Sequence, residues 1–388
     1  MPGTCQAVPP RIDVTLVRVK LYLMKCIAVL GRREEPTDGV EDYCNYLGEA
    51  LALEGIQLSS VRVRWAELGW PASRQELSAA TSAKRDVFFL LQYTALAWSK
   101  RGFSMRAVGI LKSLKKNGAR CAVVFHDPDG YVGNRAMDGV RRNLQRRTMK
   151  RLLQLSDFAV FTLALEKILW LPKDARNVFC IPVGANLPSP ERAWATERDG
   201  TRAKSIVAVF SLSDQPVRTQ EVRLIAEAVT FAAKHAGPLQ ILLMGRNSEV
   251  GGDELRAQLS SVPVEVKALG LISGEEIVTQ LGAADAMLFP RGSISSRRGS
   301  AIAGIACGLP VIAEDGSEVA APITEAGLAP VPEHRPQEFG TVLARVLTDK
   351  TYRATLAERS RNAQTRYFSW TVIAQQYAQA LRTGTDVR

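Results

Sequence analysis

The sequence predicts an α/β protein built from two doubly wound parallel-sheet domains, and three observations support this prediction. Short apolar runs alternate along the chain with helix-length amphipathic segments. A chain of 388 residues is long enough for two domains of ordinary size. Around 188–201 the alternation gives way to proline, charged and small residues, and it then starts again. We therefore expect two sheets joined by a short linker, with a cleft between the carboxyl ends of their strands.

The expected elements follow the chain in two series. The first series has strands at 26–30, 57–63, 87–91, 122–126, 158–162 and 178–182, with helices such as 41–54 and 105–117 between them. The second has strands at 206–210, 239–244, 264–268, 286–290 and 310–313, a helix at about 299–307, and helical periodicity at 336–348 and 350–381. We divide the chain into a tail (1–23), an N-terminal domain (24–188), a C-terminal domain (189–365) and a C-terminal helix (366–388) that we expect to cross back to the N-terminal domain.

The first 23 residues are expected to lie outside the fold. They are irregular, and Arg18, Lys20 and Lys25 interrupt any signal-peptide core. Met24 to Gly31 instead has the composition of a first strand of an α/β protein. Nowhere does an apolar run approach the roughly 18–20 residues that span a bilayer.

The excess positive charge lies entirely in the first half of the chain. Residues 1–190 carry 28 Lys and Arg against 17 Asp and Glu, whereas residues 191–388 carry 22 of each. This asymmetry favours either an acidic partner, such as an anionic membrane, a lipid phosphate or nucleic acid, or a well-solvated basic domain. The six cysteines lack metal-ligand spacing and there are only three histidines, so we expect no metal and no other cofactor. Thiols in apolar surroundings suit a reduced, cytoplasmic protein.

The stretch 291–300 has the features of an anion-binding loop. It is rich in Gly, Ser and Arg, and it opens directly into the helix expected at 299–307. The first N–H groups of that helix and its positive dipole end can face an anion. Arg297 and Arg298 add permanently charged, fork-shaped donors suited to phosphate.

This loop and the closing letters ACGLPVIA (306–313) resemble the nucleotide-sugar loop of GT-B glycosyltransferases, especially family 4. The resemblance covers nearly the whole chain from Met24. It implies a GT-B fold, in which two Rossmann-like domains face each other across a cleft, with the acceptor on the N-terminal side and the nucleotide sugar on the C-terminal side. The implied reaction moves a hexosyl group from a nucleotide-diphosphate sugar to an acceptor hydroxyl, with retention and without a metal. Catalytic roles would fall to His126, Arg297 and Arg298, and Ser295, Ser296, Gly299 and Ser300 would contact the donor.

Two further segments carry the resemblance into the first half. Asp38-Gly39-Val40-Glu41 matches the family's GG-V-E segment with one Gly missing, which implies that Gly39 and Val40 lie near the donor diphosphate or the acceptor. The alternative is an ordinary Asp-Gly turn with a capped helix. His126 and Asp127 end the strand in VVFHD, and His126 matches a histidine that touches the donor sugar in the family. A histidine satisfied by neighbouring backbone is the alternative.

Weaker matches add three candidates. Gln92 and Tyr93 resemble the QY segment of some bacterial family members and would contact the acceptor, or they pack in the core. Asn186, in VFCIPVGANLP, resembles the family's IPNGVD-type segment and is placed at the cleft, or it forms a turn.

The sequence also departs from the family pattern. The Arg and Lys that grip the diphosphate after the first strand of the second domain are not recognisable, and Arg218 is the only cation nearby. The Glu-x7-Glu pair would fall at Ser295 and Ala303, so both glutamates are absent. Either Arg297, Arg298 and backbone groups replace these contacts, as in an SxRRG loop of some bacterial members, or the site is degraded and the protein binds without catalysing.

We interpret the chain as a bacterial glycosyltransferase of cell-surface polysaccharide or glycolipid assembly, with a glycan or lipid-linked acceptor. The basic segment 135–151 suits peripheral contact with the inner face of the membrane, or a solvated face. Nucleic-acid binding would explain the charge but not the loop. The alternatives are a non-catalytic nucleotide- or phosphosugar-binding GT-B protein and a nucleotide-sugar epimerase. The lack of acids between Asp285 and Glu314 counts against an epimerase, which needs carboxylates at its cleft.

Overall fold

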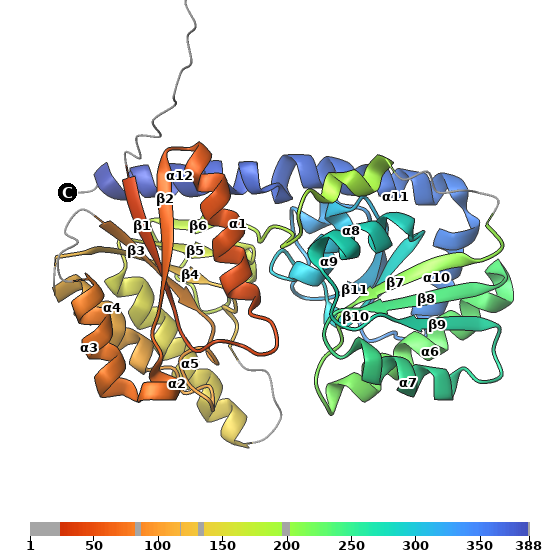
Figure 1. The fold of residues 1–388 in the computed structure, drawn as a ribbon, viewed down its shortest axis with the longest axis horizontal. Helices are drawn as coiled ribbons and strands as arrows, with labels where there is room; N and C mark the ends of the chain where they lie inside the picture. Colours follow the sequence, from red (N-terminus) through yellow and green to blue (C-terminus); the bar gives the residue numbers. More distant parts are fainter. Residues whose placement is uncertain (1–23, 82–86, 117, 131–135, 196–201, 387–388) are drawn as a thin grey trace, which may run out of the picture.

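The computed structural model describes residues 24–81, 87–116, 118–130, 136–195 and 202–386 (Figure 1). The predicted tail, 1–23, and the end of the predicted linker, 196–201, lie outside the described residues. Two six-stranded sheets, each made of parallel strand pairs, confirm the predicted α/β class. We call the first sheet with its helices the N-terminal unit and the second sheet with its helices the C-terminal unit.

The first sheet has the strand order β2-β1-β3-β4-β5-β6. Its strands are β1 (Met24–Leu30), β2 (Ile56–Arg62), β3 (Val87–Tyr93), β4 (Arg120–Phe125), β5 (Phe158–Phe161) and β6 (Val178–Cys180). Its helices are α1 (Gly39–Leu53), α2 (Trp65–Leu68), α3 (Trp70–Thr81), α4 (Arg106–Lys116) and α5 (Ala136–Leu155), with a short turn η1 (Leu165–Lys167). Side chains alternate between the faces, so that Leu90 packs with α1 while Leu91 packs with α4. Chain order reverses between β1 and β3.

The second sheet has the order β12-β11-β10-β7-β8-β9, with its reversal between β7 and β10. Its strands are β7 (Ser205–Phe210), β8 (Leu239–Met244), β9 (Val264–Ala268), β10 (Ala286–Ser293), β11 (Val311–Asp315) and β12 (Leu328–Pro332). Its helices are α6 (Val217–Ala236), α7 (Ser248–Gln258), α8 (Gly274–Ala283), α9 (Gly299–Ala306), α10 (Glu338–Thr348) and α11 (Lys350–Ala363), with short turns η2 (Pro190–Ala195) and η3 (Ile323–Glu325).

Two elements differ from the sequence prediction. Strand β12 was not predicted because its segment contains Pro330 and Pro332, which cannot donate to a ladder. They are tolerated because β12 is an edge strand that pairs only with β11. The single helix predicted at 350–381 is divided: α11 runs into a π-helical turn, η4 (Gln364–Phe368), the backbone becomes extended at Ser369, and α12 (Trp370–Asp386) follows.

Helix α12 returns to the N-terminal unit and lies along it, while α11 lies along the C-terminal unit (Figure 1). The Tyr43 hydroxyl of α1 donates to the Tyr377 hydroxyl of α12 at 2.8 Å, and both side chains are buried. The Trp370 indole donates to the carbonyl of Ala185 at 2.7 Å. These contacts fix the C-terminal helix on the first sheet.

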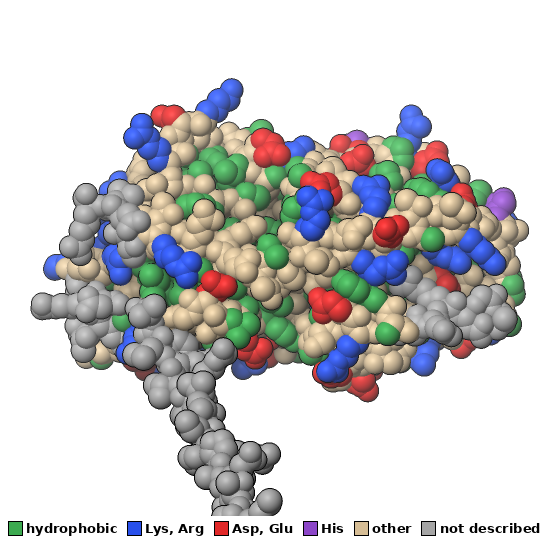
Figure 2. All heavy atoms as spheres, turned by 90° about the horizontal axis from the view of Figure 1, so that it is seen from above, with side chains coloured by type: hydrophobic (Ala, Val, Ile, Leu, Met, Phe, Trp, Pro, Cys, Tyr) green, Lys and Arg blue, Asp and Glu red, His purple; other side chains and the backbone are tan. Residues whose placement is uncertain are grey.

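The described residues contain no helix long and apolar enough to cross a bilayer. On the face seen in Figure 2, Lys and Arg side chains are spread among Asp and Glu rather than gathered in one patch. On this face, therefore, the charge asymmetry of the sequence does not form a single basic surface.

Candidate functional site

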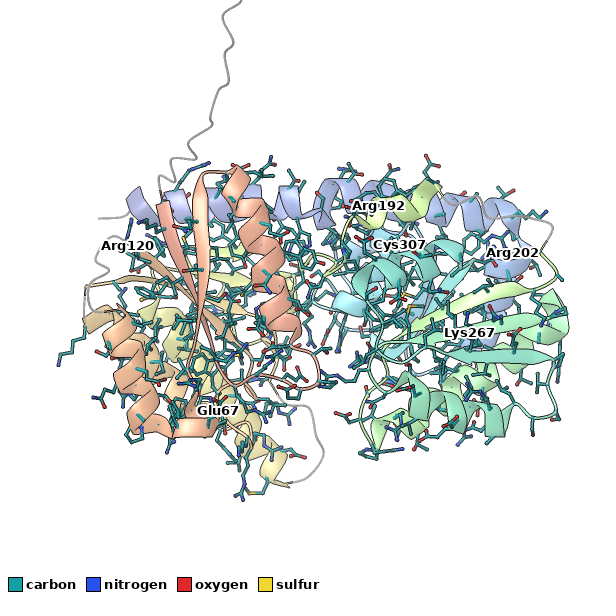
Figure 3. All side chains as sticks on the ribbon, in the orientation of Figure 1. Glu67, Arg120, Arg192, Arg202, Lys267 and Cys307 are labelled. Atoms are coloured by element: carbon teal, nitrogen blue, oxygen red, sulfur yellow. The ribbon has the colours of Figure 1, made fainter. Side chains whose placement is uncertain are left out.

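The candidate site lies where the carboxyl ends of strands from both sheets meet. In Figure 3, Arg120, which begins β4, and Glu67, on the helix after β2, lie at opposite ends of the first sheet. The loops after β1 and β3 therefore share the end marked by Glu67, at the point where chain order reverses. Open α/β sheets bind ligands at such reversals. The loop between β10 and α9 contacts this unit from the other sheet.

Two serines fix the β10–α9 loop. Ser296 donates from its hydroxyl to the carbonyl of Thr162 in the N-terminal unit at 2.7 Å, and its own carbonyl accepts from Val183 N–H at 3.0 Å. Ser295 donates to a carboxylate oxygen of Glu318 at 2.8 Å. Both serines are buried. Their hydroxyls are engaged within the protein, so the structure gives these predicted substrate-binding residues a positioning role in the loop.

Arg297 joins the two units through carboxylates. Its guanidinium lies 3.1 Å from the Asp127 carboxylate of the N-terminal unit and forms a two-pronged ion pair with Glu318 of the loop after β11. Only 13% of the Arg297 side chain is exposed. Two acids therefore already balance this predicted phosphate-binding cation.

Glu318 is a site residue that sequence reasoning missed. Burial raises its pKa, but hydrogen bonds and charge from Arg297 outweigh that effect and hold the pKa of Glu318 below its usual value. It lies outside the 286–313 interval in which an acid was sought. Only the packing of the loop after β11 brings it to Ser295 and Arg297.

Arg298 differs sharply from its neighbour. Its Nε is buried and has no hydrogen-bond partner among the described residues. Burial lowers the pKa of Arg298 to about 10, and repulsion from Arg297 and Arg291 adds to the effect. Because it stays protonated at neutral pH, Arg298 is a desolvated cation. Glu318 and Asp127 attract it, but no acid among the described residues forms an ion pair with it.

Arg291, also missed from the sequence, repeats this pattern. Its Nε is buried without a hydrogen-bond partner in the described chain, and the nearest acid, Glu221 on α6, is 3.9 Å away. Glu221 in turn accepts from the backbone and hydroxyl of Ser213, in the loop after β7. Arg291 therefore brings a cation to the loop in which the family's Arg and Lys were not recognisable.

The start of α9 completes the cationic group. Arg298 is the N-cap residue of this helix, and no side chain caps it. Gly299 is exposed, and no neighbouring atom lies within 4 Å of the place where its Cβ would be. Ser300 is half-buried beside it. N–H groups of an uncapped helix, beside Arg291 and Arg298, form an environment suited to a phosphate.

His126 lies deep on the N-terminal side of the cleft. Its Nε2 is 2.8 Å from the side-chain oxygen of Gln92, and its ring meets the Tyr43 ring edge to face at a centroid distance of 5.0 Å. Desolvation lowers the pKa of His126 to about 4, so the imidazole is neutral near pH 7. Gln92 and Asp127 line the adjoining cavity. The structure thus groups three of the predicted N-terminal residues.

Tyr93 does not belong to this group, which corrects its prediction as a substrate-binding residue. Side chains alternate along β3, so Tyr93 faces the opposite side from Gln92 and packs with α4 and α5. It is 0% exposed, and its hydroxyl lies 2.6 Å from the Ser104 hydroxyl. The packing alternative therefore holds for Tyr93.

The start of α1 is capped rather than open to a ligand. The Asp38 carboxylate accepts from Val40 and Glu41 N–H at 3.1 and 3.2 Å, so these donors do not face a phosphate. Val40 lines the cavity of the N-terminal unit. The Asn186 amide donates to the carbonyl of Gly39 at 2.9 Å, so Gly39 and Asn186 tie α1 to the segment after β6.

Arg218 is also corrected. Its guanidinium pairs with Glu254 of α7 at 3.1 Å, and 13% of the side chain is exposed. Arg218 does not line the cavity of the N-terminal unit, and it is not among the charged residues that act on Arg298. Within the described residues, no three His, Cys, Asp or Glu side chains are grouped as metal ligands.

Comparisons with known proteins bear on the fold. No protein-family model matches the chain, and a search of curated protein sequences finds no match. Among solved structures, sucrose-phosphate synthase from Thermosynechococcus elongatus is similar with a TM-score of 0.68 and 19% identity, covering 94% of this chain and 100% of that one. Anabaena HepE in complex with UDP and glucose is similar with a TM-score of 0.62 and 14% identity, covering 93% and 100%.

A putative UDP-N-acetylglucosamine 2-epimerase from Listeria monocytogenes is similar as well, with a TM-score of 0.61 and 11% identity, covering 94% of this chain and 97% of that one. At these identities the likeness shows the fold alone. Together with the two parallel sheets, it confirms the expected GT-B architecture over nearly the whole chain.

Proposed function

We propose that the protein is a glycosyltransferase that moves a sugar from a nucleotide-diphosphate sugar to an acceptor hydroxyl. The observation that carries the proposal is the group formed by Arg291, Arg298 and the uncapped start of α9. Two buried guanidinium Nε atoms without hydrogen-bond partners among the described residues lie by a helix terminus at the meeting of two sheets, and one of them, that of Arg291, has the Glu221 carboxylate 3.9 Å away. Such a group is suited to a diphosphate, and the HepE structure, which shares this fold, is a complex with UDP and glucose.

The chemistry proposed for this group is electrostatic. As the bond from the sugar to the diphosphate breaks, negative charge grows on the leaving oxygen. Arg291, Arg298 and the N–H groups of α9 would stabilise that charge from fixed positions, which is the work that a bound metal does in other enzymes. The reaction is therefore proposed to be metal-independent. It is also proposed to retain the configuration at the anomeric carbon, with the leaving group and the acceptor on the same face of the sugar. His126, held neutral, would hydrogen-bond a hydroxyl of the transferred sugar.

The biological setting is also a proposal. We place the reaction in bacterial cell-surface polysaccharide or glycolipid assembly, in the cytoplasm and at the inner membrane face, with a glycan or lipid-linked acceptor. Helix α5 supports membrane contact, because it carries cations such as Arg147 and Lys150 on exposed positions while Met137 and Val140 of its first turns are 57% and 55% exposed.

Nucleotide binding tests the donor half of the proposal. Purified protein is melted with UDP, GDP, ADP or CMP and their sugars, with and without Mg²⁺. We expect one nucleotide diphosphate to raise the melting temperature to the same extent without Mg²⁺, and the sugar nucleotide to be consumed when acceptor is added. Arg298→Ala should abolish the shift while Arg218→Ala, which removes an Arg already paired with Glu254, should retain it. No shift with any nucleotide would contradict the proposal and favour a degraded site.

One observation favours a second candidate, an epimerase acting on a nucleotide sugar. The argument against it was a lack of acids near the loop, yet folding brings Asp127 and Glu318 to Arg297, and Asp129 lies in the same electrostatic environment. Burial raises the pKa of Asp129, as expected for a group that exchanges protons. Incubation with UDP-N-acetylglucosamine in D₂O separates the candidates: epimerisation incorporates deuterium into the sugar ring, whereas a transferase without acceptor leaves the ring unlabelled.

A further inference from the structure

A cavity of about 520 Å³ lies in the N-terminal unit, beside but distinct from the cations proposed to hold the donor. The segments after β1 and β3 form most of its wall, and Arg141 and Gln145 of α5 close one side. Arg297 reaches it from the C-terminal unit, whereas Arg291 and Arg298 are not among its lining residues. The cavity therefore opens onto the same cleft from the acceptor side.

Its charged lining is unbalanced. Six cations, Arg32, Arg62, Lys100, Arg101, Arg141 and Arg297, share it with three acids, Glu34, Asp38 and Asp127.

All three acids are already engaged. Asp38 caps α1 and pairs with Arg62 at 3.1 Å, and Glu34 pairs with Arg246 of the C-terminal unit at 2.8 Å. Asp127 pairs with Arg297. None of the three is left to balance another cation of the cavity.

Three cations remain after this pairing. Arg62 and Arg297 are paired as described, and Arg141 pairs with Asp138 of its own helix. Arg32, Lys100 and Arg101 make no ion pair with any acid of the described chain. The Nε of Arg32 is also buried and has no hydrogen-bond partner in the part of the chain that the structure describes, which is costly unless a ligand supplies an acceptor.

The walls between these cations are apolar, with Leu30, Val40, Ala95 and Ala97 among them, and Leu96 is 54% exposed in the lining. Low-dielectric walls strengthen the attraction between an anion and the half-buried Arg32, whereas Lys100 and Arg101 are exposed at the rim. Arg and Lys together suit phosphate oxygens.

We propose that the acceptor carries a phosphate group, which Arg32, Lys100 and Arg101 bind in this cavity. The inference rests on the proposed transfer function and names the chemical class of its acceptor. A phosphorylated sugar and a lipid phosphate offer the same phosphate group. The exposed Leu96 offers an apolar contact for the hydrocarbon chain of a lipid phosphate.

The experiment measures binding by calorimetry to the full chain saturated with UDP. The probes are glucose 6-phosphate, glucose as its neutral counterpart, and vesicles containing phosphatidic acid. The variants are Arg32→Gln and the double variant Lys100→Gln with Arg101→Gln. The matched control is Arg33→Gln, because Arg33 is adjacent to Arg32 but exposed, paired with Glu35 at 3.6 Å, and outside the cavity lining.

We expect a phosphorylated probe to bind, glucose to bind far more weakly, and each cavity variant to weaken the phosphorylated probe about 10-fold or more, with the control unchanged. Binding of glucose 6-phosphate would identify a soluble phosphosugar, and variant-sensitive binding of the vesicles alone would identify a lipid phosphate. The inference is overturned if neither probe binds, or if Arg32→Gln and Arg33→Gln bind equally.

UDP affinity, measured on the same variants, separates this inference from the proposed function. If UDP binds every variant normally while the phosphate probes fail, only the acceptor inference fails, and the fold of the variants is shown to be intact. If UDP does not bind the wild-type chain, the donor proposal fails independently of the probes.

Discussion

Arg297 and Arg298 are adjacent in sequence, yet the structure predicts opposite consequences for replacing each by alanine. Arg297→Ala removes the cation that Glu318 and Asp127 share, and only 16% of the Glu318 side chain is exposed. Breaking a buried pair costs about 3–5 kcal/mol. Ser295 still donates to Glu318, and 39% of Asp127 is exposed, so we expect a smaller loss, about 2–3 kcal/mol of unfolding free energy.

Arg298→Ala should leave stability nearly unchanged. The side chain has no hydrogen-bond partner at its buried Nε in the described chain, and its removal relieves repulsion with Arg297 while it also removes the opposing attraction to Glu318. Nucleotide binding should suffer instead. A hydrogen bond to a charged group contributes about 1.5–3 kcal/mol, so UDP affinity should fall by about 10- to 150-fold.

Urea unfolding and calorimetry with UDP measure the two effects. Arg246→Ala is the matched control, because Arg246 also joins the two units, through Glu34 and the carbonyl of Thr37, but both contacts are exposed and 62% of the Glu34 side chain is accessible. That variant should lose less than about 1 kcal/mol. The reasoning is refuted if Arg297→Ala is no less stable than Arg246→Ala, or if Arg298→Ala binds UDP as tightly as the wild type.

Three further predictions concern the fold around the site. Because burial lowers the pKa of His126 to about 4 from its ordinary 6.5, the stability this neutral group contributes is complete above pH 6.5 and is lost as the pH falls towards 4. Between pH 7 and pH 5 the wild type should lose about 2 kcal/mol more than His126→Gln in urea unfolding, and equal losses would disprove the shift. Gly327→Ala should destabilise by about 2 kcal/mol or more in thermal melts, because its Cβ would overlap the carbonyl oxygen of Leu356; an unchanged melting temperature would contradict this packing. Asp38→Ala should lower the free energy of unfolding by about 2 kcal/mol in urea, because it removes the cap of α1 and a partner of Arg62. Asp38→Asn keeps the capping oxygen and should lose less stability; equal losses would show that the cap is unimportant.

The elements of this fold could be predicted from sequence wherever burial imposes a simple period. Strands such as β1 and β8 are apolar over most of their length because both faces are covered by helices. Strand β12 was not predicted because it is an edge strand that contains proline. The end of α11 was not predicted because the sequence has helical periodicity on both sides of the break. In these places tertiary pairing and packing outweigh local propensity.

Local sequence also predicts an anion-binding loop, since Gly, Ser and Arg before a helix are typical of such a site within a few consecutive residues. Local sequence could not assign the separate roles of the residues within that loop. Ser296 and Arg297 hold the two units together, Ser295 binds Glu318 within the C-terminal unit, and Arg298 has no ion pair among the described residues. The partners Thr162, Asp127 and Glu318 lie far away along the chain, so local sequence does not reveal them.

By itself, then, the sequence determined the α/β class and most of the two series of strands, since each follows from neighbours along the chain, and it predicts anion binding by the loop around Arg298. Only the tertiary structure decided which charges remain unsatisfied. It pairs Arg218 with Glu254, turns Tyr93 into the core and brings Arg291 to the loop after β7. The physical reason is that a charge attracts a ligand only when no nearer group neutralises it, and nearness in space is a property of the folded chain.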